Sequence, residues 1–195
     1  MEKLKILLAS SSPYRRNLLE KLGIAFEWAS PNVDETPLLK ESPSQLAHRL
    51  AEAKARHFAS KFPNHLIIGS DQVVSFTDLT LGKPHTHANA TAQLKSFCNQ
   101  EVTFVTGLCL LNPAMNRTQI CVESYKVKFR RLTDTQIENY LTREKPYDCA
   151  GSFKAEGLGI SLFDRLEGDD PNTLIGLPLI ALTRMLINEG IDPLD

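Results

Sequence analysis

The sequence contains one stretch that decides the fold we expect, Lys5-Ile6-Leu7-Leu8-Ala9-Ser10-Ser11-Ser12-Pro13-Tyr14-Arg15-Arg16. Its apolar start does not alternate with polar residues, which is typical of a strand buried on both faces. Ser12 is a favourable N-cap and Pro13 suits the first helical position, so a helix should follow directly. Leu18, Leu19 and Leu22 continue at the spacing of an apolar helix face. The stretch therefore predicts a buried strand, a tight turn and a helix.

Two arginines lie in the first turn of this helix. The helix dipole disfavours cations there, by roughly 0.3–1 kcal/mol each, so Arg15 and Arg16 need an interaction that offsets the penalty. Free backbone N–H groups, serine hydroxyls and two guanidinium groups together form a suitable site for a chain of phosphates. The alternative is an ordinary strand, turn and helix with both arginines on a wet surface.

Length and composition favour a globular protein with one main core. The chain has 195 residues, of which 42% are hydrophobic, enough for one sizeable core or two closely joined lobes. Nothing resembles a linker, so we expect a single domain over residues 1–195. The 22 basic and 23 acidic residues nearly balance, which argues against a general nucleic-acid binder. A ligand must therefore be held by a local cluster of charges.

The cysteines indicate a reducing compartment. Their spacing is too wide for a CxxC metal or redox motif, so we expect free thiols and a cytoplasmic protein; they are Cys98, Cys109, Cys121 and Cys149. The apolar part of residues 1–9 is shorter than the core of a signal peptide, and no segment is long enough to cross a bilayer. We expect no membrane partner.

The rest of the chain mixes helical and strand patterns. A capping box at Ser42 starts a helix that should end near Ser60, and another at Thr133 starts a further helix. The remaining expected elements are strands at 25–29, 66–75, 101–111, 118–130 and 160–166, and helices at 88–97 and 177–188. The strands at 101–111 and 118–130, joined by a short turn at 112–116, should form a hairpin.

An acidic residue lies within the most strand-like segment. Residues 66–75 are apolar and rich in β-branched side chains, yet they carry Asp71 and Gln72 at their centre. Leaving a buried carboxylate unpaired costs several kcal/mol, so Asp71 needs a cation, hydrogen-bond donors or an opening to a cleft. The alternative is a structural Asp71 satisfied by a neighbouring turn.

Further charged residues occur on predicted loops and helices. Asp34 and Glu35 lie in a rigid loop between two prolines, which suits a hard divalent cation held by one or two carboxylates. A solvated acidic turn is the alternative. The turn at 81–84 projects Lys83, and the helix after Ser42 carries Lys54 in its second half. Such carboxylates and cations suit metal-assisted hydrolysis of a phosphoanhydride, and no Walker motif, serine triad or cysteine nucleophile competes.

The order of six motifs adds a resemblance to a known family. The chain resembles the Maf family of nucleotide pyrophosphatases over nearly its whole length, through ASSSPYRR (9–16), VDETP (33–37), GSDQV (69–73), GKP (82–84), AGSF (150–153) and GLP (176–178). The resemblance implies an α/β fold of two lobes around a long, curved mixed sheet, with a central cleft. It also implies cleavage of a nucleoside triphosphate between its α- and β-phosphates, and a homodimer.

The resemblance also assigns roles to individual residues. It implies that Asp71 is the proton acceptor and, with Glu35, holds a divalent cation, Mg²⁺ or Mn²⁺. The positions that handle the substrate or its phosphates fall on Lys54, Lys83, Ser10 and Arg15, to which the local pattern adds Arg16.

Three positions are implied to select the base, and they fall on Tyr14, Gln72 and Glu156. Here the chain resembles the branch that acts on 7-methyl-GTP. Methylation at N7 makes guanine cationic, and an aromatic ring at Tyr14 attracts a cation by roughly 0.5–2 kcal/mol. Glu156 adds a negative partner that accepts hydrogen bonds from the guanine edge. Two alternatives stay open: the same reaction on UTP, dTTP or CTP, and a non-catalytic nucleotide-binding regulator of septum formation.

Overall fold

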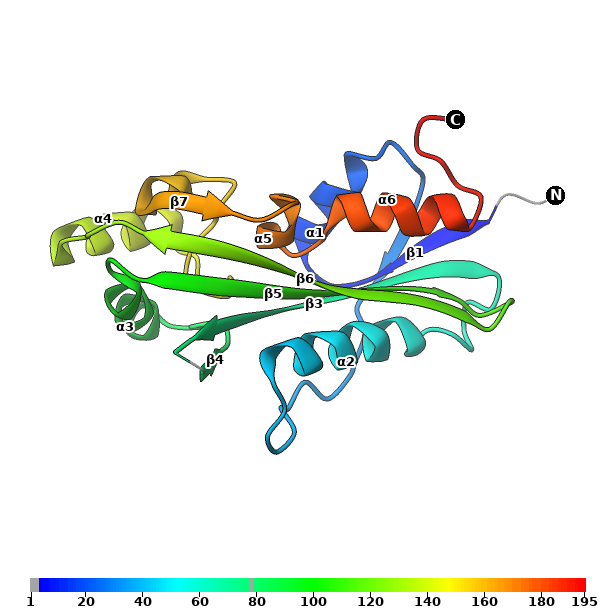
Figure 1. Cartoon of the computed structure of the whole chain (residues 1–195), viewed down its shortest axis with the longest axis horizontal. Helices are drawn as coiled ribbons and strands as arrows, with labels where there is room; N and C mark the ends of the chain where they lie inside the picture. Colours follow the sequence, from blue (N-terminus) through cyan, green and yellow to red (C-terminus); the bar gives the residue numbers. More distant parts are fainter. Residues whose placement is uncertain (1–3, 78) are drawn as a thin grey trace.

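The computed structural model describes residues 4–77 and 79–195. Within them, strands form a seven-stranded sheet in the order β2-β1-β3-β5-β6-β7, with β4 paired to β3 (Figure 1). The strands are β1 (Lys5–Ala9), β2 (Glu27–Ala29), β3 (His65–Phe76), β4 (Leu79–Leu81), β5 (Glu101–Asn112), β6 (Arg117–Phe129) and β7 (Phe163–Glu167). The helices are α1 (Pro13–Glu20), α2 (Pro43–Arg56), α3 (His87–Phe97), α4 (Asp134–Glu144), η1 (Leu158–Leu162), α5 (Asn172–Ile175) and α6 (Leu179–Asn188).

The sheet is mixed, as the resemblance implies. Strands β2, β1 and β3 run parallel, whereas β3, β5, β6 and β7 pair antiparallel. Helix α2 covers one face, and α1, α5 and α6 lie on the opposite face (Figure 1). The predicted hairpin is confirmed, because β5 and β6 pair from Glu101 opposite Lys128 to Asn112 opposite Arg117.

Two large apolar clusters occupy the two ends of the long strands. One contains Val74 and Phe104 with residues of α3 and α4, such as Leu94. The other contains Ile68 and Leu108 with residues of β1, α1 and α6. Because β3 and β5 contribute to both clusters, two lobes share one continuous sheet.

Two glycines let helix α2 lie unusually close to the sheet. A Cβ atom at Gly69 of β3 would stand 2.2 Å from the backbone oxygen of Ala51 in α2. A Cβ atom at Gly107 of β5 would stand 2.1 Å from the backbone oxygen of Ala47 in α2. Any larger residue would push the helix away. The close approach brings the side chain of Lys54 onto the strand that carries Asp71.

Several predicted boundaries were wrong. Helix α2 ends at Arg56 rather than near Ser60, and the strand expected at 25–29 begins at Glu27. The first part of the strand expected at 160–166 belongs instead to the 3-10 helix η1, whose Leu158 N–H donates to Glu144 Oε1 at 3.1 Å. The last helix begins two residues late because Gly176 (φ 109°) ends α5 and Pro178 precedes α6.

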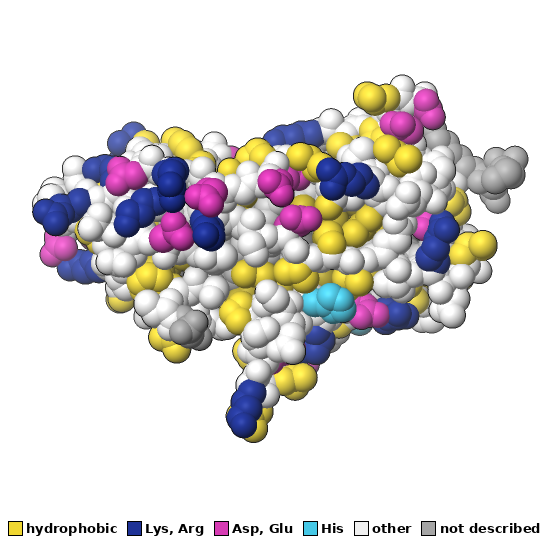
Figure 2. All heavy atoms as spheres, in the orientation of Figure 1, with side chains coloured by type: hydrophobic (Ala, Val, Ile, Leu, Met, Phe, Trp, Pro, Cys, Tyr) yellow, Lys and Arg dark blue, Asp and Glu magenta, His cyan; other side chains and the backbone are white. Residues whose placement is uncertain are grey.

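The surface of the molecule carries mixed charge. On the face shown in Figure 2, basic and acidic side chains are interspersed. Among the described residues, no helix combines the length and the hydropathy that a bilayer-crossing segment requires.

Candidate active site

A cavity of about 720 Å³ collects residues that are far apart in the sequence. They come from the β1–α1 turn, the loop before α2, α2 itself, β3, the β4 turn, the loop at 148–156 and α5. Among its lining residues are nine predicted site residues: Ser10, Tyr14, Arg15, Glu35, Lys54, Asp71, Gln72, Lys83 and Glu156. The fold therefore brings the predicted phosphate, metal and base positions to one place.

Lys54 connects the two predicted metal ligands. Its Nζ lies 2.6 Å from Asp71 Oδ1 and 2.6 Å from Glu35 Oε1. The side chains of Lys54 and Asp71 are only 8% and 10% exposed, whereas that of Glu35 is 60% exposed. The carboxylate in the apolar strand is thus paired with a cation at a cavity, and not satisfied by a neighbouring turn. We call these three residues the Lys54 cluster.

The turn after β1 forms as predicted. Ser12 caps α1 by accepting a hydrogen bond from the Arg15 N–H at 3.4 Å, and Ser10 Oγ accepts one from the Ser12 N–H at 3.1 Å. The Arg15 side chain donates from Nε to the Gly176 carbonyl at 2.8 Å and from Nη1 to Ser10 Oγ at 3.5 Å. Burial lowers the pKa of Arg15, while the charge of Asp71 raises it. The guanidinium therefore lies within electrostatic reach of the Lys54 cluster.

Arg16 is placed differently from the prediction. It is not among the cavity-lining residues, and its guanidinium carbon lies 4.1 Å from the centre of the Trp28 ring. Successive residues of a helix point about 100° apart, so α1 directs Tyr14 and Arg15 to the cavity while Arg16 points toward Trp28 of β2. The structure thus brings Arg15, but not Arg16, to the cavity.

Tyr14 lies among groups of the loop at 148–156. Its hydroxyl donates to Asp148 Oδ2 at 3.4 Å and accepts from Cys149 Sγ at 3.5 Å. Burial, followed by the interaction with Cys149, raises the pKa of Tyr14 well above its usual range, so the phenol stays neutral. We call Tyr14, Asp148 and Cys149 the Tyr14 cluster. Neither Asp148 nor Cys149 was predicted as a site residue, although both directly precede the AGSF motif at 150–153.

Gln72 has a fixed orientation in the cavity wall. Its Nε2 donates to the carbonyls of Thr173 and Leu174 at 2.9 and 3.1 Å, and lies 3.2 Å from Thr106 Oγ1. Two carbonyl acceptors occupy both amide hydrogens. The group that Gln72 offers to a ligand is therefore its carbonyl oxygen, a hydrogen-bond acceptor.

The residues present fit a divalent cation of the magnesium type. Glu35 and Asp71 meet at a single ammonium group, so their carboxylates already converge. Within residues 4–77 and 79–195 there is no group of three or more His, Cys, Asp or Glu suited to a metal ion. Magnesium is commonly held by one or two carboxylates, with substrate phosphates and waters as the other ligands. The donor set suits that arrangement rather than a cage made by protein alone.

Comparisons with known proteins identify one family and several similar proteins. A family description, Maf-like protein, matches residues 5–189. A 7-methyl-GTP pyrophosphatase of Nitrosococcus oceani is 55% identical over 185 residues, which cover 95% of this chain and 93% of that protein. A solved HAM1 protein from Coxiella burnetii has a TM-score of 0.47 and 18% identity, with 67% of this chain and 75% of that chain covered. A Ham1 protein of Staphylococcus aureus has a TM-score of 0.46 and 16% identity, with 64% and 71% covered.

Proposed function

The chain belongs to the Maf family, and we propose from this premise that it cleaves 7-methyl-GTP to 7-methyl-GMP and pyrophosphate. The observation that carries the proposal is the convergence of Asp71, Lys54 and Glu35 at one cavity that also contains Arg15 and Lys83. The relative named 7-methyl-GTP pyrophosphatase, at 55% identity, supports the choice of substrate.

We propose Asp71 as the general base. A carboxylate can accept the proton of an attacking water, which typically contributes 10²–10⁴-fold to a rate. The pair with Lys54 at 2.6 Å holds the Asp71 carboxylate at the cavity wall. Asp71 and Glu35 would also hold Mg²⁺ or Mn²⁺, which when bound would neutralise phosphate oxygens and orient the water.

The cations around the Lys54 cluster would stabilise the charge that develops on the leaving pyrophosphate. Arg15 is held by Gly176 and Ser10, so its guanidinium needs little reorganisation when phosphate binds. Lys83 is exposed on the turn after β4 and lines the cavity, so it is free to follow the phosphates. Ser10 adds a hydroxyl beside Arg15.

The Tyr14 side of the cavity would hold the base. The neutral Tyr14 ring offers a π-face to the cationic 7-methylguanine, and Glu156 adds a carboxylate on the same wall. The Gln72 carbonyl oxygen suits the N–H donors on the guanine edge. Tyr14 and Glu156 therefore favour this base over those of UTP, dTTP or CTP.

A non-catalytic regulator of septum formation is the second candidate. A protein that only binds nucleotide gains little from a carboxylate positioned to activate water, whereas here Asp71 is held beside Lys54 and Glu35. We also keep as proposals the single-domain organisation, the cytoplasmic location, a homodimer, and a role in removing modified nucleotides. A deletion strain that accumulates no modified nucleotide would rule out the last of these.

The test is pyrophosphate release from a panel of natural and methylated triphosphates with Mg²⁺. We expect 7-methyl-GTP to be cleaved fastest, with pyrophosphate rather than orthophosphate as the second product. Faster cleavage of GTP or UTP would overturn the substrate assignment. Binding of all triphosphates without turnover would favour the regulator.

A further inference from the structure

Arg49 of helix α2 makes three contacts outside the cavity. Its Nε lies 2.6 Å from Glu41 Oε1, and its Nη2 lies 2.8 Å from Glu41 Oε2. The same Nη2 donates to the backbone carbonyl of Thr36 at 3.0 Å. The Glu41 side chain is 7% exposed, so this two-pronged pair is shielded from water on the carboxylate side. Bidentate pairs of this kind are among the stronger charge-assisted hydrogen bonds.

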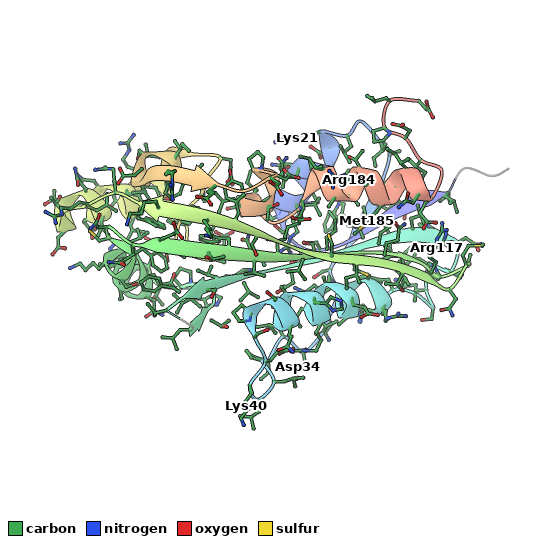
Figure 3. All side chains as sticks on the ribbon, in the orientation of Figure 1. Lys21, Asp34, Lys40, Arg117, Arg184 and Met185 are labelled. Carbon is green, nitrogen blue, oxygen red and sulfur yellow. The ribbon has the colours of Figure 1, made fainter. Side chains whose placement is uncertain are left out.

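These contacts close the loop that carries Glu35. Glu41 Oε2 also accepts from the Leu38 N–H at 2.9 Å, and Asp34 Oδ1 accepts from the Thr36 N–H at 2.9 Å. The loop projects from the body of the protein beside α2, as Figure 3 shows near Lys40 and Asp34, and the same projection is visible in Figure 2. Leu38 and Leu39 are 60% and 93% exposed, so apolar packing does not hold it. Its shape depends on polar contacts to Arg49.

The carboxylate of Glu35 depends on that loop shape. Glu35 directly precedes Thr36, whose carbonyl Arg49 binds, and its side chain is 60% exposed where it pairs with Lys54. An exposed ion pair contributes little by itself, typically 0–1 kcal/mol. Without the Arg49 contacts, the Glu35 side chain would therefore be free to leave the Lys54 cluster.

We propose that Arg49 is a positioning residue, whose paired contacts with Glu41 and Thr36 hold the Glu35 carboxylate beside Lys54 and Asp71. The inference rests on the proposed function, in which Glu35 helps to hold a divalent cation. The hydrogen bond from Arg49 lowers the pKa of Glu41 to about 2, so the pair stays ionised at neutral pH. A lysine at position 49 cannot reproduce the guanidinium fork.

The experiment compares Arg49→Ala and Arg49→Lys with Arg56→Ala. Arg56 is a matched control, because it lies on the same helix and pairs with Glu52 at 2.7 Å, away from the loop. For each variant, Mn²⁺ affinity is measured by water-proton relaxation in the presence of a non-hydrolysable α,β-methylene triphosphate. Hydrogen exchange of residues 34–41 and urea unfolding are measured on the same samples.

We expect Arg49→Ala to weaken Mn²⁺ binding by about 10–100-fold, as is usual for residues that orient metal ligands. It should speed exchange in residues 34–41 and lower kcat, with the nucleotide KM within about threefold of wild type. The Mn²⁺ affinity of Arg49→Lys should lie between those of wild type and Arg49→Ala, and Arg56→Ala should match wild type. Adding Arg49→Ala to Glu35→Ala should cause no further loss of Mn²⁺ affinity, because both changes take the Glu35 carboxylate away from the cation.

Two results would overturn the proposal. One is an Arg49→Ala protein with wild-type Mn²⁺ affinity and loop exchange. The other is a double variant, Glu35→Ala with Arg49→Ala, in which the two losses of Mn²⁺ affinity multiply. If the wild-type protein cleaves no triphosphate at all, the proposed function fails, but loop exchange and Mn²⁺ binding still test the role of Arg49.

Discussion

The Lys54 cluster and the Tyr14 cluster lie in one cavity but are built in different ways. The ion pairs of Lys54 measure 2.6 Å and join residues that are mostly on regular elements. The contacts of Tyr14 measure 3.4 and 3.5 Å and join a helix to a loop. The difference suggests that the groups for phosphate chemistry are fixed before substrate binds, while the groups for the base adjust to it.

The backbone explains this difference. Gly69 and Gly107 let helix α2 contact the centre of the sheet, which holds the backbones that carry Lys54 and Asp71 close together. The loop at 148–156 follows Lys145 and contains Gly151 and Ser152, all with left-handed backbone at φ 47°, 79° and 62°. Residues in such loops are replaced and rearranged more easily than residues of a packed helix.

Replacing Lys54 should have the largest effect and would test whether its cluster is rigid. Lys54→Met leaves Asp71 buried without its cation, so we expect the free energy of unfolding to fall by about 3 kcal/mol. Lys83→Met, at an exposed lysine of the same cavity, should change it by less than about 0.5 kcal/mol. Urea denaturation measures both. Equal stability of the two variants would show that the Lys54 cluster is not structurally fixed.

Replacing Glu156 should change substrate preference without changing stability. In Glu156→Gln the base loses a charged partner, so the ratio of kcat/KM for 7-methyl-GTP to that for GTP should fall about tenfold. The measurement is pyrophosphate release from both nucleotides. An unchanged ratio would remove Glu156 from base recognition.

Replacing Tyr14 should have a smaller effect on the same ratio. Tyr14→Leu removes the aromatic face, and we expect the preference for the methylated base to fall about threefold. Tyr14→Phe keeps the ring but removes the bond to Asp148, so it should retain the preference. If Tyr14→Phe loses as much of the preference for 7-methyl-GTP as Tyr14→Leu does, then the hydroxyl and not the ring recognises the base.

The smallest expected effect concerns the reactivity of the Cys149 thiol in the Tyr14 cluster. Burial raises the pKa of Cys149 to about 12, so at pH 8 almost none of it is thiolate. Labelling by iodoacetamide should therefore be at least about tenfold slower than in urea-unfolded protein, and should speed up as pH rises toward 12. Mass spectrometry of the Cys149 peptide measures both rates. Equal rates at pH 8 would contradict the half-buried position of Cys149.

The sequence predicted the Lys54 cluster better than its surroundings. Asp71 could be predicted because a carboxylate in an apolar strand violates the local pattern and needs a partner. Arg16 could not be separated from Arg15, because the place of its side chain depends on Trp28 of strand β2. Asp148 and the pair of Arg49 with Glu41 were missed, since they depend on loop conformations and on contacts that no local periodicity records.

The most direct test of the account is pyrophosphate release by Asp71→Asn beside the wild-type protein, with 7-methyl-GTP and Mg²⁺. If Asp71 is the proton acceptor at a preformed site, turnover should fall at least about 100-fold while nucleotide binding stays within about threefold. Turnover by Asp71→Asn at the wild-type rate would show that another group takes the proton.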